Sequence, residues 1–275
     1  MAAIAELTYY PVKGCAGTAV RDAVLTPAGL AHDRSFMVVG ENGVFRSQRQ
    51  DPLMARIRPE VSADGEQLTL AAPGTGAVTL QVDTSAPRRE VELFKKQYRG
   101  VDQGEQAAAW LSDVLGAPSR LMRVPPEHER VSGGLTPGTV GYADSCAVLV
   151  ASLASLAGLN ERIAEGGSGP LPVDRFRPNI VVSGWAEPHT EDRVRRMTIG
   201  DTELGYSKIA IRCAVTTIDQ RSGTRSGPEP LRTLAGYRRA AAGGVAFGAK
   251  FAVTRTGKLS VGDEITVTAW GDSGL

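Results

Sequence analysis

Residues 36–46 read Phe-Met-Val-Val-Gly-Glu-Asn-Gly-Val-Phe-Arg, and this stretch sets the expectation for the fold. Two apolar runs, Phe36–Val39 and Val44–Arg46, flank the tetrapeptide Gly40–Gly43. Its Asn-Gly step favours the tight turn of a β-hairpin, because both residues tolerate a positive φ. The first part of the chain is therefore predicted to be built from short, turn-connected strands.

The surrounding sequence repeats this pattern. Asp64-Gly65 separates Ile57–Val61 from Gln67–Leu70, which predicts a second hairpin. Ile4–Tyr10 and Ala19–Leu25 are also typical of strands. Short strands at this spacing favour a barrel or a sandwich.

Helices and a second unit follow. Periodic apolar residues predict helices over Gln103–Leu115 and Ser152–Ile163. Between them, Pro125-Pro126 opens a polar, Gly-rich run to Gly141, which we take as the boundary between units at 124/125. The later strands are predicted near Ala147–Val150, Ile180–Ser183, Met197–Ile199, Lys208–Val215 and Glu264–Ala269. The predicted fold class is mainly β with α+β elements, in two units.

Length and composition agree with two packed units in a soluble protein. The chain has 275 residues, of which 42% are hydrophobic and 22% charged. With 31 Lys and Arg against 30 Asp and Glu, a strongly basic nucleic-acid binder is disfavoured. We find no signal peptide and no apolar stretch near the roughly 20 residues of a bilayer helix. Three distant cysteines fit a reducing cytoplasm, where we expect the protein to reside without membrane contact.

Several common site types are missing from the sequence. None of the three histidines forms an HExxH or HxxxH pair, and there is no GxSxG, P-loop or strand-linked GxGxxG motif. Three cysteines cannot supply the four thiolates of an ordinary iron–sulfur cluster. Any redox role would need an imported cofactor and an external source of electrons.

Four segments combine cations, turn-forming residues and small polar groups, and each has two interpretations. Lys13 is either an exposed turn lysine or a phosphate ligand beside Gly14, and Asp33-Arg34 is either a surface pair or an anion site. Arg175–Asn179 is either a strand entry or an oxyanion fork whose Asn179 amide reads a polar ring edge. Asp144-Ser145-Cys146 either starts a buried strand or lines a pocket.

Cys213 is the residue with the most divergent interpretations. On a regular strand it shares a face with Ile209, Ile211 and Val215, which indicates a buried core cysteine, with Arg212 on the opposite face. A reactive or metal-binding thiolate instead needs positive charge nearby. Spacing alone favours the core position.

Taken in order, these segments resemble the MOSC-domain proteins that carry an N-terminal MOSC β-barrel, including the amidoxime-reducing components. The resemblance spans about Ala5 to Val267. It rests on these motifs: Tyr10-Pro-Val-Lys13, Asp33-Arg34, Arg49-Gln-Asp-Pro52, Ser152–Asn160, Phe176–Gly184, Arg212-Cys213, Thr216-Thr-Ile-Asp219, Pro230–Leu234 and Val261-Gly-Asp263.

The resemblance implies a MOSC N-terminal β-barrel-like domain over 1–124 and a MOSC β-barrel domain over 125–271. It also implies a molybdenum cofactor between them, with Cys213 as the catalytic residue and molybdenum ligand. The other implied cofactor contacts are Lys13, Gly14, Arg34, Asp144, Ser145, Cys146, Arg177, Asn179, Ile211, Arg212 and Lys250. Gly14, Ile211 and Lys250 depart from the family pattern, where a serine, a small polar residue and a tyrosine stand.

The activity implied is reduction of the N–O bond of small N-hydroxylated compounds, with electrons from an external ferredoxin-like or cytochrome-like protein. The alternative from the same superfamily is a non-catalytic carrier of molybdenum cofactor or of sulfur, held on Cys213 as a persulfide. In both cases the cofactor carries the difficult chemistry and the protein binds and orients it.

Overall fold

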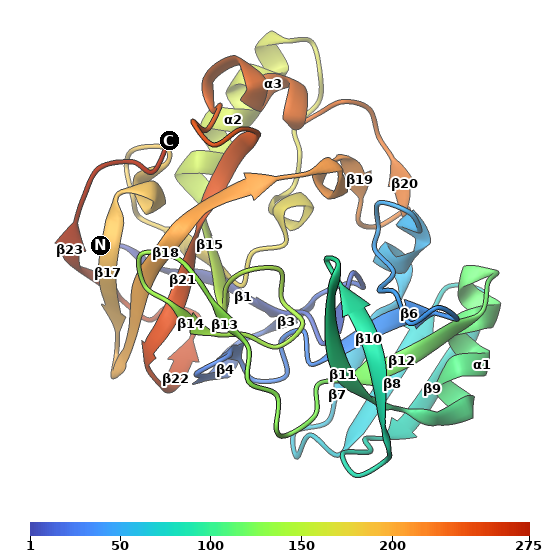
Figure 1. The fold of residues 1–275 in the computed structure, drawn as a ribbon. Helices are drawn as coiled ribbons and strands as arrows, with labels where there is room; N and C mark the ends of the chain where they lie inside the picture. Colours follow the sequence, from blue (N-terminus) through green and yellow to red (C-terminus); the bar gives the residue numbers. More distant parts are fainter.

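The computed structural model describes all residues from 1 to 275, and most of its regular structure is strand (Figure 1). The largest sheet has eight strands, in the order β23 (Ile265–Trp270), β17 (Val194–Ile199), β18 (Thr202–Arg212), β21 (Val245–Arg255), β15 (Val148–Ser152), β16 (Ile180–Ser183), β1 (Ala3–Tyr9) and β3 (Thr18–Val20). A five-stranded sheet has the order β10 (Arg88–Leu93), β11 (Lys96–Asp102), β12 (Ser119–Arg123), β6 (Phe36–Gly40) and β2 (Val12–Lys13).

Smaller sheets complete the strand content. Two have three strands: β22 (Gly257–Ser260), β4 (Asp22–Thr26) and β5 (Gly29–Leu30); and β7 (Arg58–Val61), β8 (Gln67–Ala72) and β9 (Gly76–Gln81). Two are pairs: β13 (Val131–Ser132) with β14 (Gly138–Thr139), and β19 (Ile218–Asp219) with β20 (Thr224–Arg225). The mainly β class with a few helices is confirmed.

The predicted barrels are not closed. Each sheet has an open strand order, and in the largest sheet only an isolated bridge, Ala3 to Glu264, links β1 to the residue before β23. The predicted strand Ala19–Leu25 is also broken. β3 pairs with β1, whereas β4 pairs with β22 in another sheet, so the chain changes sheets at Arg21.

Both predicted long helices form. α1 (Gly104–Leu115) buries Ala107 and Leu111 and ends at Gly116, whose left-handed φ of 64° is costly for a residue with a side chain. α2 (Leu153–Glu165) begins where the Ser152 hydroxyl accepts a hydrogen bond from the Ser155 N–H. A third, α3, covers Leu231–Tyr237, and short 3₁₀ turns lie at Pro52–Arg56, Val173–Phe176, Thr190–Asp192 and Ala214–Thr217.

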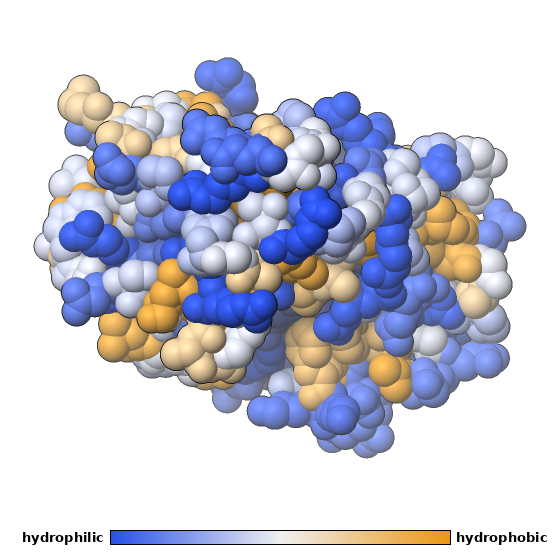
Figure 2. Space-filling view, turned by 90° about the horizontal axis from the view of Figure 1, so that it is seen from above, coloured by the Kyte–Doolittle hydropathy of each residue, from blue (hydrophilic) through white to orange (hydrophobic).

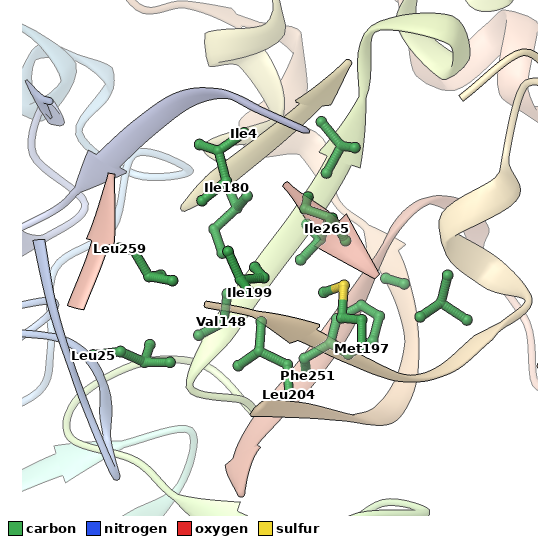
Figure 3. Close-up of a cluster of buried hydrophobic side chains, with 14 of the residues drawn as sticks. Ile4, Leu25, Val148, Ile180, Met197, Ile199, Leu204, Phe251, Leu259 and Ile265 are labelled. Atoms are coloured by element: carbon green, nitrogen blue, oxygen red, sulfur yellow. The ribbon is translucent and has the colours of Figure 1, made fainter. Parts of the chain in front are cut away.

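The two halves of the chain interlock. β1, from the N-terminus, pairs antiparallel with β16, so the first strand lies in the sheet of the later strands (Figure 1). Ile4 therefore packs with Ile180, Ile265 and Phe251 in one buried cluster (Figure 3). A separate cluster under the early strands includes Leu111 of α1. The boundary at 124/125 stays a prediction.

The outer surface is mainly hydrophilic on the face seen from above, with hydrophobic residues in separated patches (Figure 2). No helix combines the length and the apolar character needed to cross a bilayer.

Candidate functional site

An open cleft gathers the residues that the resemblance implies as cofactor contacts. Every predicted cofactor contact, from Lys13 to Lys250, and Cys213 itself line this one cleft. Its walls come from both parts of the chain, because residues 13–49 and Phe94 face residues 143–250. Seven cationic side chains line it against a single carboxylate, that of Asp144. Such a surface attracts an anionic ligand.

Lys13 is positioned by the parallel pairing of β2 with β6, opposite Met37. It is only 7% exposed, so the exposed-turn interpretation is wrong. Its ammonium pairs with the Asp144 carboxylate. Burial lowers the pKa of Lys13, and Asp144 opposes that shift. Gly14 follows with φ of 84°, and a Cβ there would lie 2.9 Å from the Met54 Cε. The backbone can therefore approach a ligand where a larger residue would not fit.

Arg34 is held by a buried network rather than by a surface pair. Its guanidinium donates to Asp33 Oδ2 at 2.6 Å and to Asn179 Oδ1 at 3.2 Å. Asp33 is 6% exposed and its other oxygen accepts from the Tyr10 N–H at 2.8 Å. Although burial opposes the charge, Asp33 keeps the pKa of Arg34 above its usual value. The group stays cationic and fixed.

Arg177, from the later part of the chain, lies over the same Tyr10 ring as Arg34. The guanidinium carbons of Arg34 and Arg177 lie 4.2 and 4.3 Å from the centroid of the Tyr10 ring. Both arginines have a left-handed backbone, with φ of 47° and 54°. Such conformations are uncommon outside glycine and cluster at functional sites. Burial lowers the pKa of Arg177. Arg175, in contrast, is buried, does not line the cleft and pairs with Asp219 at 3.2 Å. The oxyanion-fork interpretation therefore depends on Arg177 and stays a prediction.

Asn179 does not play the part expected from the sequence. Its amide nitrogen donates to Thr8 O at 3.1 Å and Asp33 Oδ1 at 3.0 Å. Its oxygen accepts from Arg34 and from the Leu149 N–H. All four hydrogen-bonding positions are therefore used within the protein, and no free amide edge is left for a ring. Asn179 positions Arg34 instead.

The opposite wall is formed by the start of β15 and by β21. Lys250 donates to the Ser145 hydroxyl at 2.7 Å, and burial lowers the pKa of Lys250. Cys146 is buried and its thiol donates to the Phe251 carbonyl. Burial raises the pKa of Cys146, so this thiol stays protonated at neutral pH.

Cys213 is exposed in the cleft, and the core position that the strand pattern favoured is wrong. β18 has a bulge between Ile209 and Ile211 and ends at Arg212. Beyond it, Cys213 starts the 3₁₀ turn Ala214–Thr217, so strict alternation of faces no longer applies. Ile211, 40% exposed, lines the cleft with it.

Arg212 lies beside this thiol rather than on an opposite face. Its guanidinium donates to the Phe176 carbonyl at 2.6 Å, while its buried Nε has no hydrogen-bond partner. The Nε of Arg46, also in the cleft, is buried and unpartnered as well. Burial lowers the pKa of Arg212 to about 10. Unsatisfied buried donors are uncommon in proteins, and these two belong to side chains that line the cleft.

The sequence analysis missed part of the lining. Phe45, Phe94 and Gln48 were not singled out, yet all three line the cleft. Gln48 and Gln220 exchange amide hydrogen bonds of 3.0 and 2.9 Å across the two parts of the chain. A lone glutamine or phenylalanine carries no motif, so only the fold reveals them. Elsewhere, no group of three or more His, Cys, Asp or Glu side chains could hold a metal ion.

Comparison with known proteins agrees with this arrangement. Residues 1–118 match the model of the MOSC N-terminal beta barrel domain and residues 137–266 that of the MOSC domain. Human mitochondrial amidoxime-reducing component 1 is 32% identical over 282 residues, covering 95% of this chain and 82% of that protein.

The molybdenum cofactor sulfurase of Danio rerio is 35% identical over 263 residues, covering 89% of this chain but 31% of the sulfurase. Among solved structures, the YUAD protein from Bacillus subtilis matches with a TM-score of 0.45 and 12% identity, covering 96% of this chain and 94% of that chain. On the domain matches and the sequence identities, this chain belongs to the MOSC family.

Proposed function

We propose that this protein binds a molybdenum cofactor in the cleft and reduces N-hydroxylated compounds with it. The names of its relatives support a molybdenum-cofactor-related function. The observation that carries the proposal is the lining itself, in which seven cations and one carboxylate surround the exposed thiol of Cys213. We place the protein in the cytoplasm.

The residues present fit this cofactor. Its phosphate would lie against Lys13, Arg34 and Arg177, with the backbone of Gly14 close by. The buried, unpartnered Nε of Arg212 offers a donor to the pterin or the phosphate. Cys213 offers one soft sulfur ligand for the metal. The remaining ligands would be the pterin sulfurs and oxygen, which do not come from the protein.

The ion pair between Lys13 and Asp144 must open for Lys13 to reach a phosphate. Lys13 is buried, whereas the Asp144 side chain is 65% exposed. Asp144 can therefore turn to water when an anion takes its place beside the buried ammonium. Asp144 would therefore be the counter-ion that keeps the buried Lys13 charged until the anion binds.

When bound, the cofactor would supply the two-electron chemistry of N–O reduction. The overall change takes an N-hydroxy group, two electrons and two protons to an N–H group and water. A ferredoxin-like or cytochrome-like protein would deliver the electrons. The residues of the chain would hold the anionic cofactor and keep Cys213 exposed in the cleft. The cleft would stay open to a small molecule.

A second candidate is a non-catalytic carrier, favoured by the identity with the sulfurase and by the exposure of Cys213. The carrier would bind cofactor, or hold sulfur as a persulfide, without turnover.

The test is metal analysis of the protein purified from a cofactor-producing host, combined with an assay using a reduced viologen as electron donor. We expect bound molybdenum and pterin with reduction of a hydroxamic acid. Cys213→Ser should fold normally and lose reduction, while Cys15→Ala, which removes a thiol from the core, should keep it. Bound cofactor without turnover would support the cofactor carrier, and a persulfide on Cys213 without molybdenum would support the sulfur carrier. A protein that holds neither molybdenum cofactor nor persulfide sulfur would refute both candidates.

A further inference from the structure

The hairpin formed by β10 and β11 ends in a turn with an unfavourable backbone. Leu93 pairs with Lys96, so only Phe94 and Lys95 connect the strands. Their φ angles are 54° and 63°. Two-residue turns of this kind favour Asn-Gly, because a bulky side chain is disfavoured in the left-handed region. The sequence therefore keeps an aromatic residue where the turn itself does not favour one.

Phe94 is fixed at the edge of the cleft. The Phe94 ring meets the Phe45 ring edge-on, with the two centroids 4.9 Å apart. The Lys13 ammonium lies 4.9 Å from the centroid of the Phe94 ring. Two residues before Phe94, the backbone N–H of Glu92 donates to the Gly43 carbonyl and its carbonyl accepts from the Phe45 N–H, at 2.9 and 3.0 Å. These bonds anchor the hairpin against the neighbouring loop. Phe94 nevertheless remains 40% exposed.

Ile211 contributes a second apolar side chain to the same cleft. It is also 40% exposed and lies two residues before Cys213, beside the bulge in β18. Phe94 and Ile211 are the two large exposed apolar side chains that line the cleft, and they come from the two parts of the chain. A cleft lined by both cationic and apolar side chains matches a ligand with a polar end and an apolar body.

We propose, resting on the reductase function above, that Phe94 determines substrate specificity. Phe94 and Ile211 form an apolar rim that receives the aryl body of an N-hydroxylated substrate while the N–O group faces Cys213. The strained backbone of Phe94 is retained because the ring is needed at this position, at the expense of stability. The substrate class is thereby narrowed to N-hydroxy compounds with an aromatic substituent.

The test uses a matched pair of substrates, benzohydroxamic acid and acetohydroxamic acid, which differ in a phenyl against a methyl group. Phe94→Asn removes the ring and suits the left-handed backbone. It should lower kcat/KM for the benzo compound about tenfold, mainly through KM. It should lower kcat/KM for the aceto compound much less than for the benzo compound, and it should leave the molybdenum content unchanged. The control is Lys95→Gly, which relaxes the adjacent residue outside the cleft and should leave both substrates unchanged.

Equal loss for both substrates, or loss of molybdenum from Phe94→Asn, would overturn the proposal, since Phe94 would then serve the cofactor or the fold. Calorimetric binding of benzohydroxamic acid to the cofactor-loaded protein separates this proposal from the reductase function. If the wild-type protein reduces neither compound, the reductase function fails. The rim is then supported by about tenfold weaker binding to Phe94→Asn, and refuted by equal binding.

Discussion

Replacing Asp33 with alanine tests whether the cations of the cleft depend on a buried anchor. The Asp33 carboxylate accepts from the Tyr10 N–H, the Asn179 amide and the Arg34 guanidinium, at 2.8, 3.0 and 2.6 Å. Asp33→Ala leaves the backbone donor of Tyr10 without its partner and the guanidinium without its countercharge.

The magnitude follows from these two losses. Removing one partner of a buried ion pair costs about 3–5 kcal/mol, and leaving a buried donor unpaired costs about 1–3 kcal/mol. Arg34 keeps its bonds to Asn179 and to the Arg177 carbonyl, and its side chain is 14% exposed. We therefore expect a loss near the lower end, about 4 kcal/mol in the free energy of unfolding.

Urea unfolding followed by tryptophan fluorescence measures this loss. The control is Glu127→Ala, which removes a paired carboxylate that is 57% exposed, held by Arg88 at 2.7 Å. Exposed pairs contribute about 0–1 kcal/mol. If Asp33→Ala costs no more than Glu127→Ala, the description of Asp33 as a buried anchor is wrong.

Three further predictions concern the same cleft. Brief treatment of the folded, cofactor-free protein with iodoacetamide should label Cys213 alone, seen by mass spectrometry, because the other two thiols are buried; labelling of a second site would contradict their burial. Gly14→Ala should destabilise the protein more than Gly74→Ala in chemical unfolding, because both have a positive φ but only the first Cβ meets a neighbour within 4 Å. Although burial opposes ionisation, Lys13 keeps the pKa of Asp144 below its usual value, so this carboxylate stabilises the fold at neutral pH and that contribution is lost as the pH falls below about 4. Asp144→Asn should therefore make the free energy of unfolding fall less steeply as the pH decreases below about 4. An unchanged pH dependence would count against the Lys13–Asp144 ion pair.

Local patterns predicted the elements well where turn chemistry decided them. The Asp64-Gly65 step lies between β7 and β8 as expected, and Gly43 has the positive φ that its turn requires. The predicted Val44–Arg46 strand does not form, and this stretch has two isolated bridges, Val39 to Phe45 and Val44 to Glu92. Sheet closure failed because a barrel depends on long-range pairing that no local pattern encodes.

The site followed from the resemblance rather than from periodicity. Alternation along β18 predicted a buried Cys213, and it failed because a bulge is a long-range consequence of pairing with β21. Asn179 lines the cleft, yet its amide is used within the protein rather than left free for a ring edge. Phe94 and Gln48 needed the fold, since only folding brings these isolated residues to the cleft.

The position of β1 has a consequence for how the protein is made. β1 pairs with β16 at Ile180–Ser183. β4 pairs with β22 at Gly257–Ser260. During synthesis β1 and β4 therefore leave the ribosome long before β16 and β22 exist, although β3 and β5 are already available on their other edges. A chain released early would expose unpaired strand edges, which favour aggregation. The residues that line the cleft can meet only after Lys250 has been synthesised, so a ligand can enter a completed cleft only after that point.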